Sequence, residues 1–243
     1  MTVGDRVVAS GLEDLQRGLM TLDRVVVAFS GGADSALLAR VAHDTLGADR
    51  VRAVTAVSPS LAGDQLADAA ALAGEWSLRW TTVETHEMES AAYRVNDAHR
   101  RAHCKDALMD VLEPIAGAEG ATVLLGVNAD DLTDHRPGQA AAEARGARFP
   151  LAEAGLTKAD VRALSRHLGL RTWDKPAAAC LASRVPYGTE VTVSVLSAVE
   201  CAEAALQRLG FDDLRLRHYG DTARIEVPLD RLADVLEARR KMV

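Results

Sequence analysis

The sequence predicts an α/β fold, in which a parallel sheet is covered by helices on both faces and is followed by a smaller α+β region. Helix-type and strand-type apolar patterns alternate up to about residue 170, the order expected of such a sheet. The final part of the chain shows a different order of elements, helix, strand, strand and helix. With 243 residues, of which 48% are apolar, the chain is long enough to bury a core.

The alternating region predicts its elements one by one. Apolar periodicity favours helices and strands in turn at 9–20 (helix), 24–30 (strand), 34–47 (helix), 51–58 (strand), 62–76 (helix), 78–85 (strand), 96–116 (helix) and 122–128 (strand). Successive strand–helix–strand units predict parallel strands joined by right-handed connections. Residues 138–150 are small, charged and glycine-bearing, and they predict an irregular connection.

The rest of the chain predicts a domain boundary. A helix capped by Thr157 and closed by Gly169 precedes residues 171–189, which hold two prolines and a glycine without sustained periodicity. A loop of this length in a compact domain is usually functional when ordered. A helix, a strand pair and a helix then follow, at 191–210, 213–220, 222–228 and 229–242. We therefore predict a main domain at 1–170, an active-site loop at 171–189 and a small α+β domain at 190–243.

The composition excludes some classes of function. A net charge of −7 argues against broad electrostatic binding of nucleic acid. No apolar run reaches membrane-spanning length, and the first residues carry acids without a long apolar core or a small-residue cleavage site. The three cysteines are odd in number and widely spaced, which suits reduced thiols. We expect a cytoplasmic protein with neither a nucleic-acid nor a membrane partner.

A phosphate-binding loop is predicted where the first strand passes into the next helix. Gly31 and Gly32 let the backbone approach an anion and adopt positive φ, while Ser30 and Ser35 add hydroxyl donors. Asp34 would repel a phosphate unless a divalent cation lay between them, so it predicts Mg²⁺. The loop is neither a Walker A sequence nor a dinucleotide fingerprint. The alternative is a tight turn that uses glycine for geometry alone.

A second polar motif follows the strand at 122–128. Gly126 allows close approach of the backbone, and the acids Asp130, Asp131 and Asp134 crowd the strand end. Ligands of open α/β sheets bind at the carboxyl ends of the strands, so these acids are candidates for metal or ribose binding. Taken alone, the motif fits a solvated acidic loop better, but the phosphate loop predicted in the same sheet favours ligand binding.

Cys180 is the candidate nucleophile. It lies in the predicted loop near Lys175, Ser183 and Arg184, and neighbouring cations favour the thiolate form of a cysteine. The alternative is a buried cysteine that serves as a small apolar residue. Cys201 lies on a predicted amphipathic helix and fits that alternative better, whereas Cys104 stands near a helix start without a second cysteine close by.

Several strings of the sequence resemble a known family. Ser-Gly-Gly-x-Asp-Ser after a strand resembles the PP-loop of the ATP pyrophosphatases, which cleave ATP between its α and β phosphates. Five strings, in order along the chain, resemble the sacrificial sulfur transferases of nickel-pincer nucleotide synthesis, the LarE-type branch of the PP-loop proteins: VAFSGGADSALLARVAHDTLG, VTAVSPSL, LLGVNADDLTDHRPG, WDKPAAACLASRVPYG and GFDDLRLRHYGDTARIEV. The implied fold is a PP-loop domain of the adenine nucleotide alpha hydrolase-like, Rossmann-like kind, with a smaller α+β C-terminal domain.

The resemblance also implies a reaction. In that family ATP, with Mg²⁺, adenylates a ring carboxylate of pyridinium-3,5-biscarboxylic acid mononucleotide. A cysteine thiolate then displaces AMP, and C–S cleavage leaves a thiocarboxylate on the substrate and dehydroalanine in the protein. The donor cysteine of the family's motif matches Cys180. Relatives form ring-like assemblies, so the resemblance also implies a homo-oligomer.

Individual roles follow from the same resemblance. The loop residues would bind pyrophosphate and two residues of the second motif would lie near the nucleotide: Ser30, Gly31, Gly32, Asp34 and Ser35, with Gly126 and Asp130. Ser183 and Arg184, after the donor cysteine, would orient the substrate. Arg215 and Arg217 match a pair that binds the substrate's phosphate or carboxylates. Glu200 or Glu203, and Glu226, are weaker candidates, and their alternative is a solvated surface.

One departure from the family bears on the sulfur source. Some relatives hold an iron–sulfur cluster with a C-x-x-C pair and the loop cysteine, but the first cysteine of that pair is Arg101 here. Only Cys104 and Cys180 stay in register. We therefore favour the sacrificial route and expect no iron–sulfur cluster.

Two other classes of function stay open. A PP-loop amidotransferase or tRNA-thiolating enzyme would use ammonia or another sulfur source, although the acidic charge weakens the tRNA version. A non-catalytic nucleotide-binding module would keep the phosphate loop and would not depend on Cys180.

Overall fold

The computed structural model describes residues 3–133, 137–177 and 179–238. Within it the chain forms two compact units: unit 1 is Met1–Ser58, Gly63–Glu87 and Arg101–Ala178, and unit 2 is Pro59–Ala62, Met88–Arg100 and Ala179–Val243. These bounds differ from the domains expected at 1–170 and 190–243, because unit 2 also draws on two short segments from the first half of the chain. Each unit is described by itself.

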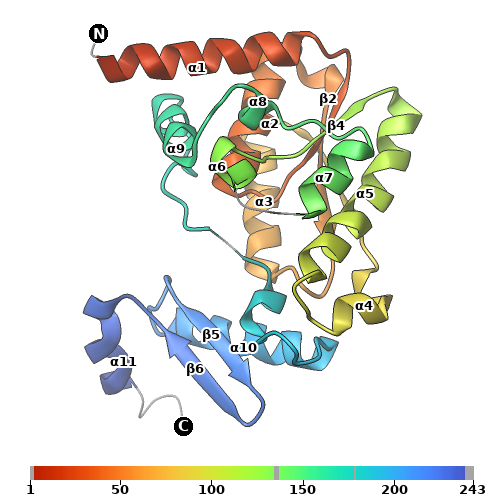
Figure 1. The fold of residues 1–243 in the computed structure, drawn as a ribbon. Coiled ribbons are helices and arrows are strands. Elements are labelled where there is room, and N and C mark those ends of the chain that lie inside the picture. The colour runs from red at the N-terminus through yellow and green to blue at the C-terminus, as the bar shows by residue number, and fades with distance from the viewer. Residues whose placement is uncertain (1–2, 134–136, 178, 239–243) are drawn as a thin grey trace. The chain divides into compact units, whose positions relative to one another are not determined.

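Unit 1 is built on a parallel sheet (Figure 1). Its strands are β1 (Val25–Ala28), β2 (Val51–Val57), β3 (Arg79–Glu84) and β4 (Thr122–Leu124), in the order β3-β2-β1-β4. After β1 the chain builds outward through β2 to β3 and then returns to place β4 on the other side of β1. The carboxyl ends of β1 and β4 therefore form the switch point at which open α/β sheets bind their ligands.

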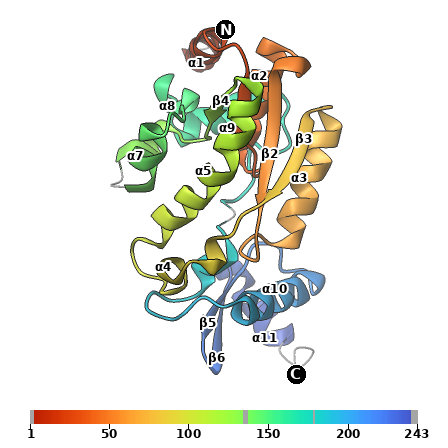
Figure 2. The same cartoon turned by 90° about the vertical axis from the view of Figure 1, so that its right-hand side faces the viewer.

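Helices cover both faces of this sheet. Val25 and Val27 of β1 point into one core cluster and Val26 points into another, because successive strand residues face opposite sides. The first cluster is completed by α1 (Val3–Met20), α2 (Ala33–Leu46), α3 (Gly63–Glu75), α8 (Pro150–Glu153) and α9 (Lys158–His167). The second is completed by α5 (Arg100–Glu119) and α7 (Pro137–Ala144). Figure 2 shows α5 and α3 on opposite sides of the strands.

The predicted α/β fold is confirmed, with differences at its connections. Residues 138–150, expected to be irregular, include all of α7 except its first residue, Pro137, and the Gln-Ala-Ala-Ala-Glu-Ala run of this helix has high helix propensity. The stretch before α5 holds a 3₁₀ turn (Glu87–Glu89) and α4 (Ala91–Arg94). Further short elements are the 3₁₀ turn Ala48–Arg50 and α6 (Ala129–Thr133).

Unit 2 contains the predicted order of helix, strand, strand and helix. It runs through the 3₁₀ turn η3 (Leu181–Arg184), α10 (Val193–Arg208), β5 (Arg215–Tyr219), β6 (Thr222–Glu226), a 3₁₀ turn (Leu229–Arg231) and α11 (Leu232–Ala238). The two strands are antiparallel, with Leu216 opposite Ile225. Their core also includes Tyr93, from the earlier segment that joins this unit.

None of the helices in the described parts of the chain is both long enough and apolar enough to cross a membrane.

Candidate functional site

The loop between β1 and α2 has the backbone of an anion-binding turn. Gly31 has φ +68°, which side chains rarely adopt, and a Cβ there would lie 3.1 Å from Cα of Ala69 on α3. Both the backbone conformation and the close contact therefore favour glycine at this position. Gly32 has φ −76° and is the N-cap of α2, so the expectation of positive φ is right for Gly31 and wrong for Gly32. Because Gly32 has no side chain to cap the helix, the first-turn amides of α2 are left for a ligand.

The two hydroxyls of the loop stabilise its shape. Oγ of Ser30 and Oγ of Ser35 lie 3.0 Å apart, and the Ser30 amide donates to Oγ of Ser35 at 3.2 Å. Ser35 is buried, and its hydroxyl donates to the Gly32 carbonyl at 3.2 Å. These serines were predicted to bind phosphate directly. In this structure their bonds run within the loop and set its curvature.

Gly126 brings the end of β4 against the phosphate loop. A Cβ at this position would lie 2.9 Å from the Ser35 amide nitrogen and 3.1 Å from the Asp34 carbonyl carbon, both of them backbone atoms. Only glycine lets the end of β4 approach the start of α2 this closely. The close approach inferred from the sequence is thus present, and it places the second motif beside the first turn of α2.

A polar network connects the phosphate loop, the second motif and the start of α9. Asp34 accepts a hydrogen bond from Nδ2 of Asn128 at 3.2 Å and forms an ion pair with Nζ of Lys158 at 2.5 Å. The Lys158 amide donates to Asp130 at 2.8 Å, and the Asp130 amide donates to Asn128 at 3.0 Å. Three elements far apart in the sequence therefore meet around one carboxylate.

Sequence reasoning missed Lys158 and Asn128. Lys158 is the first residue of α9, directly after Thr157, whose side chain forms a reciprocal capping box with Asp160. That box fixes the helix start, and with it the lysine. The available signal was a lysine at the N-terminus of a helix, where a cation opposes the helix dipole and therefore calls for an anionic partner.

Asp34 is the residue of the phosphate loop that was expected to hold Mg²⁺. Within the described residues no group of three or more His, Cys, Asp or Glu side chains could hold a metal. Asp34 supplies one carboxylate, which is the usual protein contribution to Mg²⁺ that is otherwise bound by phosphates and water. Asp134, the last acid of the second motif, lies outside the described residues.

Lys175 reaches the phosphate loop as well. Its Nζ donates to the Gly31 carbonyl at 2.9 Å and also bonds the carboxylate of Asp68 on α3. Burial alone would raise the pKa of Asp68, but hydrogen bonds from Lys175 and Arg171 outweigh it and hold that pKa below its ordinary value. Lys175, expected to act as a cation near Cys180, is thus engaged within unit 1 in stabilising the loop.

In unit 2, Cys180 lies just before η3, and hydrogen bonds hold the backbone on either side of its thiol. The residue is half-buried. Its carbonyl accepts the Ser183 amide at 2.9 Å, and the next amide, of Leu181, donates to the Ser60 carbonyl at 2.9 Å. Leu181 is itself buried in the core of this unit. The thiol therefore belongs to an ordered segment.

Arg184 and Glu203 form a buried ion pair behind this segment. Nε of Arg184 lies 2.9 Å from Oε1 of Glu203, and both residues are less than a tenth exposed. Arg184 also donates to the Ala179 carbonyl at 2.5 Å, and Glu203 accepts the Leu216 amide at 2.9 Å. The pair thus connects the residue before Cys180 to strand β5.

The two arginines of β5 have different surroundings. Arg217 donates to the Ser183 carbonyl at 2.8 Å and pairs with Glu226 at 2.9 Å. Burial would raise the pKa of Glu226, but Arg217 and Arg224 together lower it. Arg215 is exposed, and no carboxylate pairs with it in the described parts of the chain. Glu200 is half-buried on α10.

The other two cysteines, Cys104 and Cys201, are exposed. Cys104 belongs to unit 1, on α5, and Cys201 to unit 2, on α10. Cys201 was expected to be a buried apolar residue, and its exposure overturns that expectation.

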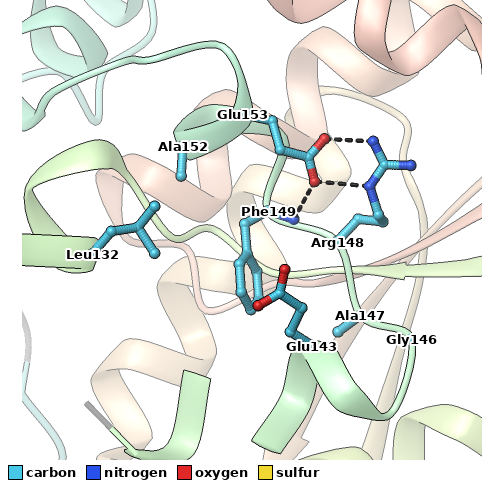
Figure 3. Close-up of a pocket in the computed structure, with 8 residues that line it drawn as sticks. All are labelled: Leu132, Glu143, Gly146, Ala147, Arg148, Phe149, Ala152 and Glu153. Carbon is cyan, nitrogen blue, oxygen red and sulfur yellow. Dashed lines mark hydrogen bonds and ion pairs between the residues drawn. The ribbon is translucent and has the colours of Figure 1, made fainter. Parts of the chain in front are cut away.

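A separate pocket of about 300 Å³ lies in unit 1 (Figure 3). Its lining includes Phe149 and an ion pair at 2.6 Å between Arg148 and Glu153. The hydrogen bond from Arg148 and a bond from the Phe149 amide lower the pKa of Glu153 below its ordinary value, and they outweigh burial, which would raise it. None of the predicted site residues lines this pocket.

Comparisons with known proteins agree with this geometry. Residues 14–110 match the family described as NAD synthase. The chain is 46% identical, over 94% of its own length and 85% of the relative's, to the uncharacterized protein slr1717 of Synechocystis. It is 39% identical, over 91% of its length and 81% of the relative's, to the pyridinium-3,5-bisthiocarboxylic acid mononucleotide synthase of Lactiplantibacillus plantarum. A shorter match, 43% over 79 residues, is to the glutamine-dependent NAD(+) synthetase of Rhodobacter capsulatus.

The parallel sheet, its phosphate loop and the match to the NAD synthase family define an ATP-dependent enzyme of the PP-loop class. Within that class the chain belongs to the LarE-type family, which includes the synthase of Lactiplantibacillus plantarum.

Proposed function

We propose that this enzyme is a sulfur transferase that converts a carboxylate of pyridinium-3,5-biscarboxylic acid mononucleotide into a thiocarboxylate, with Cys180 as the sulfur donor. The name of the Lactiplantibacillus plantarum relative, pyridinium-3,5-bisthiocarboxylic acid mononucleotide synthase, gives a thiocarboxylate as that enzyme's product, and we carry this product class over to the present chain. The observation that carries the proposal is the state of Cys180, a half-buried thiol on a backbone held by hydrogen bonds on both sides.

The first step is adenylation of the substrate. A carboxylate oxygen attacks the α phosphorus of ATP, and pyrophosphate leaves. The first-turn amides of α2 and the Lys158 ammonium, which pairs with Asp34, would bind the phosphates of the leaving group. Asp34 would hold Mg²⁺ together with phosphate oxygens, and the ion would neutralise phosphate charge when bound. The acyl adenylate then carries a good leaving group, AMP.

The second step transfers sulfur. The Cys180 thiolate attacks the acyl carbon, AMP departs with the C–O bonding electrons, and a thioester forms. A base removes the Cα proton of residue 180, and those electrons form the Cα–Cβ double bond as the Cβ–S bond breaks. The substrate leaves as a thiocarboxylate and the protein retains dehydroalanine. No oxidant or reductant is needed.

Residues around Cys180 have supporting roles in this proposal. Arg184 and Glu203 are positioning residues, because their buried pair fixes the carbonyl before Cys180. The exposed guanidinium of Arg215, together with that of Arg217, would bind the substrate's phosphate or carboxylate. The Ser183 hydroxyl lies 3.1 Å from the Arg184 guanidinium and would orient the substrate.

We also propose that the enzyme works in the cytoplasm as a homo-oligomer, without a nucleic-acid or membrane partner. Light scattering coupled to size-exclusion chromatography tests the assembly, and a monomer at all concentrations would contradict it.

The test of the function is product analysis with ATP, Mg²⁺ and the pyridinium dicarboxylate. We expect AMP and pyrophosphate from the wild type, with one thiocarboxylate per chain. Cys180→Ser should still release pyrophosphate but form no thiocarboxylate, whereas Cys201→Ser should match the wild type. Production of ADP and phosphate would contradict the loop assignment. Full thiocarboxylate formation by Cys180→Ser would rule out Cys180 as the donor.

A further inference from the structure

A buried asparagine holds the segment that follows Cys180. Asn96 is fully buried and has φ +58°, a left-handed conformation that is uncommon outside glycine. Its Nδ2 lies 2.8 Å from the Pro186 carbonyl, 2.9 Å from that of Thr189 and 3.3 Å from that of Val185. One amide group with two N–H donors is thus shared among three carbonyls of a single turn.

Arg100 holds the same segment from its other end. This arginine is 5% exposed, and its Nη1 donates to Oδ1 of Asn96 at 2.7 Å and to the Ala182 carbonyl. The ring of Tyr187 lies 5.9 Å from the guanidinium carbon. The arginine therefore reaches the backbone two residues beyond Cys180 and orients the Asn96 amide at the same time.

Backbone bonds reinforce these side chains. The Gly188 amide donates to the Asn96 carbonyl at 3.0 Å, and the Val191 amide donates to the Arg94 carbonyl at 2.9 Å. All of these residues belong to unit 2. The positive φ of Asn96 persists because the surrounding bonds determine it, and such strain is usually retained where geometry matters.

We propose that Asn96 and Arg100 are positioning residues that fix Cys180 for the sulfur-transfer step. This inference rests on the proposed function, in which Cys180 is the donor. Buried polar networks rigidify a segment when every member is satisfied, and here the satisfied groups are the carbonyls of Ala182, Val185, Pro186 and Thr189. Neither residue touches reacting atoms, and each acts through the backbone.

The two halves of the reaction should respond differently. Adenylation uses the phosphate loop of unit 1, whereas sulfur transfer requires the thiolate to be aligned with the acyl carbon. A misplacement of about 1 Å costs on the order of 100-fold in such a step. We call Asn96 and Arg100, with their hydrogen bonds to the segment after Cys180, the clamp. Loss of the clamp should slow sulfur transfer and leave pyrophosphate release unchanged.

Asn96→Gly is the main test variant. Glycine accepts a positive φ without strain, so this change removes the side-chain bonds while it keeps the backbone conformation. We expect pyrophosphate release at the wild-type rate, thiocarboxylate formation slower by about 10- to 100-fold, and an unchanged KM for ATP. Hydrogen exchange of peptides covering 182–191 should be faster than in the wild type. Alkylation of Cys180 by iodoacetamide, measured by peptide mapping, should be faster as well.

Two further variants keep the test decisive. Arg100→Lys retains the charge and can make one of the two bonds, so its rate should lie between those of the wild type and Asn96→Gly. Asp97→Asn is the control, since the Asp97 side chain accepts the nearby His99 amide and bonds no residue of the Cys180 segment in the described parts of the chain, and it should match the wild type. Thermal denaturation of each variant measures general loss of stability.

The outcomes separate this inference from the proposed function. The clamp is refuted if Asn96→Gly forms thiocarboxylate and exchanges its amide hydrogens at the wild-type rates. It is also refuted if this variant loses pyrophosphate release and sulfur transfer to the same extent. If the wild type itself forms no thiocarboxylate, the proposed function fails. In that case, unchanged rates of hydrogen exchange and of Cys180 alkylation in Asn96→Gly would still refute the clamp. Faster rates would show that Asn96 holds the segment after Cys180 in place.

Discussion

At the scale of single residues, the ion pair between Lys158 and Asp34 decides how the phosphate loop tolerates a carboxylate. Asp34 stands in the first turn of α2, where a nucleotide phosphate would bring further negative charge. The Lys158 ammonium, 2.5 Å away, neutralises the carboxylate beforehand. Charge-assisted hydrogen bonds of this kind contribute about 1.5–3 kcal/mol.

Lys158→Gln should therefore weaken ATP binding by at least about tenfold. The effect should be largest without Mg²⁺, because the Asp34 carboxylate would then face phosphate with no cation between them. Isothermal titration with ATP measures it. Arg162→Gln, on an exposed position of the same helix, is the matched control and should bind as the wild type does. Equal affinities for both variants would remove Lys158 from the nucleotide site.

The sequence was informative about residues that stand together in one string. The turn at residues 30–35 could be predicted because glycines, hydroxyls and a helix start are contiguous there. The role of Lys158 could not, because its partner is 124 positions away; its place at a helix N-terminus indicates only that some anionic group lies nearby. Asn96 likewise shows its role only through carbonyls about 90 residues further along.

At the scale of elements, Gly126 sets the distance between β4 and α2. A methyl group there would overlap backbone atoms of Asp34 and Ser35, which cannot rotate away as a side chain could. Gly117 on α5 offers the opposite case, because a Cβ there meets nothing within 4 Å.

Gly126→Ala should destabilise the protein by about 1–3 kcal/mol through overpacking. Gly117→Ala makes the same chemical change and should stabilise it by about 0.5–1 kcal/mol, since alanine is the better helix former. Urea denaturation of the two variants gives the comparison. Gly126→Ala as stable as the wild type would show that the strand end and the helix start can separate freely.

Most elements were predictable because their apolar periodicity matches their burial. Val25 to Val27, for example, alternate between the two core clusters of unit 1. Helix α7 was missed because glycines at both ends of its region suggested a connection, while the alanine run between them favours a helix.

At the scale of the whole molecule, several carboxylates connect stability to pH. Glu119, at the end of α5, bonds Arg52 of β2 at 2.6 Å and Arg79 of β3 at 2.9 Å. Burial would raise the pKa of Glu119, but the two arginines outweigh it and lower that pKa. Glu113 has a lowered pKa chiefly through its hydrogen bond with Arg145.

Since these pKa values are lower in the folded state, the unfolded chain takes up protons first as the pH falls. Their contribution to stability is complete above the ordinary glutamate value of 4.5 and is lost as the pH falls through the folded-state values. Urea midpoints should thus decrease below about pH 4.5. Glu119→Gln should make that decrease shallower, whereas Asp14→Asn, in an exposed pair on α1, should not. Identical pH profiles for Glu119→Gln and the wild type would contradict this account.

The organisation into units was the least predictable feature. Unit 2 includes Pro59–Ala62 and Met88–Arg100, which interrupt the chain of unit 1. Tyr93, in the second of these segments, is buried in the core of unit 2 and its hydroxyl bonds Ser60 at 2.7 Å. Such pairing between distant segments leaves no periodic pattern in the sequence.

If Cys180 gives up its sulfur, the intact protein becomes lighter, so its mass is the decisive measurement. After one turnover with ATP, Mg²⁺ and the pyridinium dicarboxylate, the chain should be lighter by one H₂S, and peptide mapping should find dehydroalanine at residue 180. Without ATP the mass should not change. A chain that keeps its full mass while thiocarboxylate accumulates would contradict the account and would show that the sulfur comes from elsewhere.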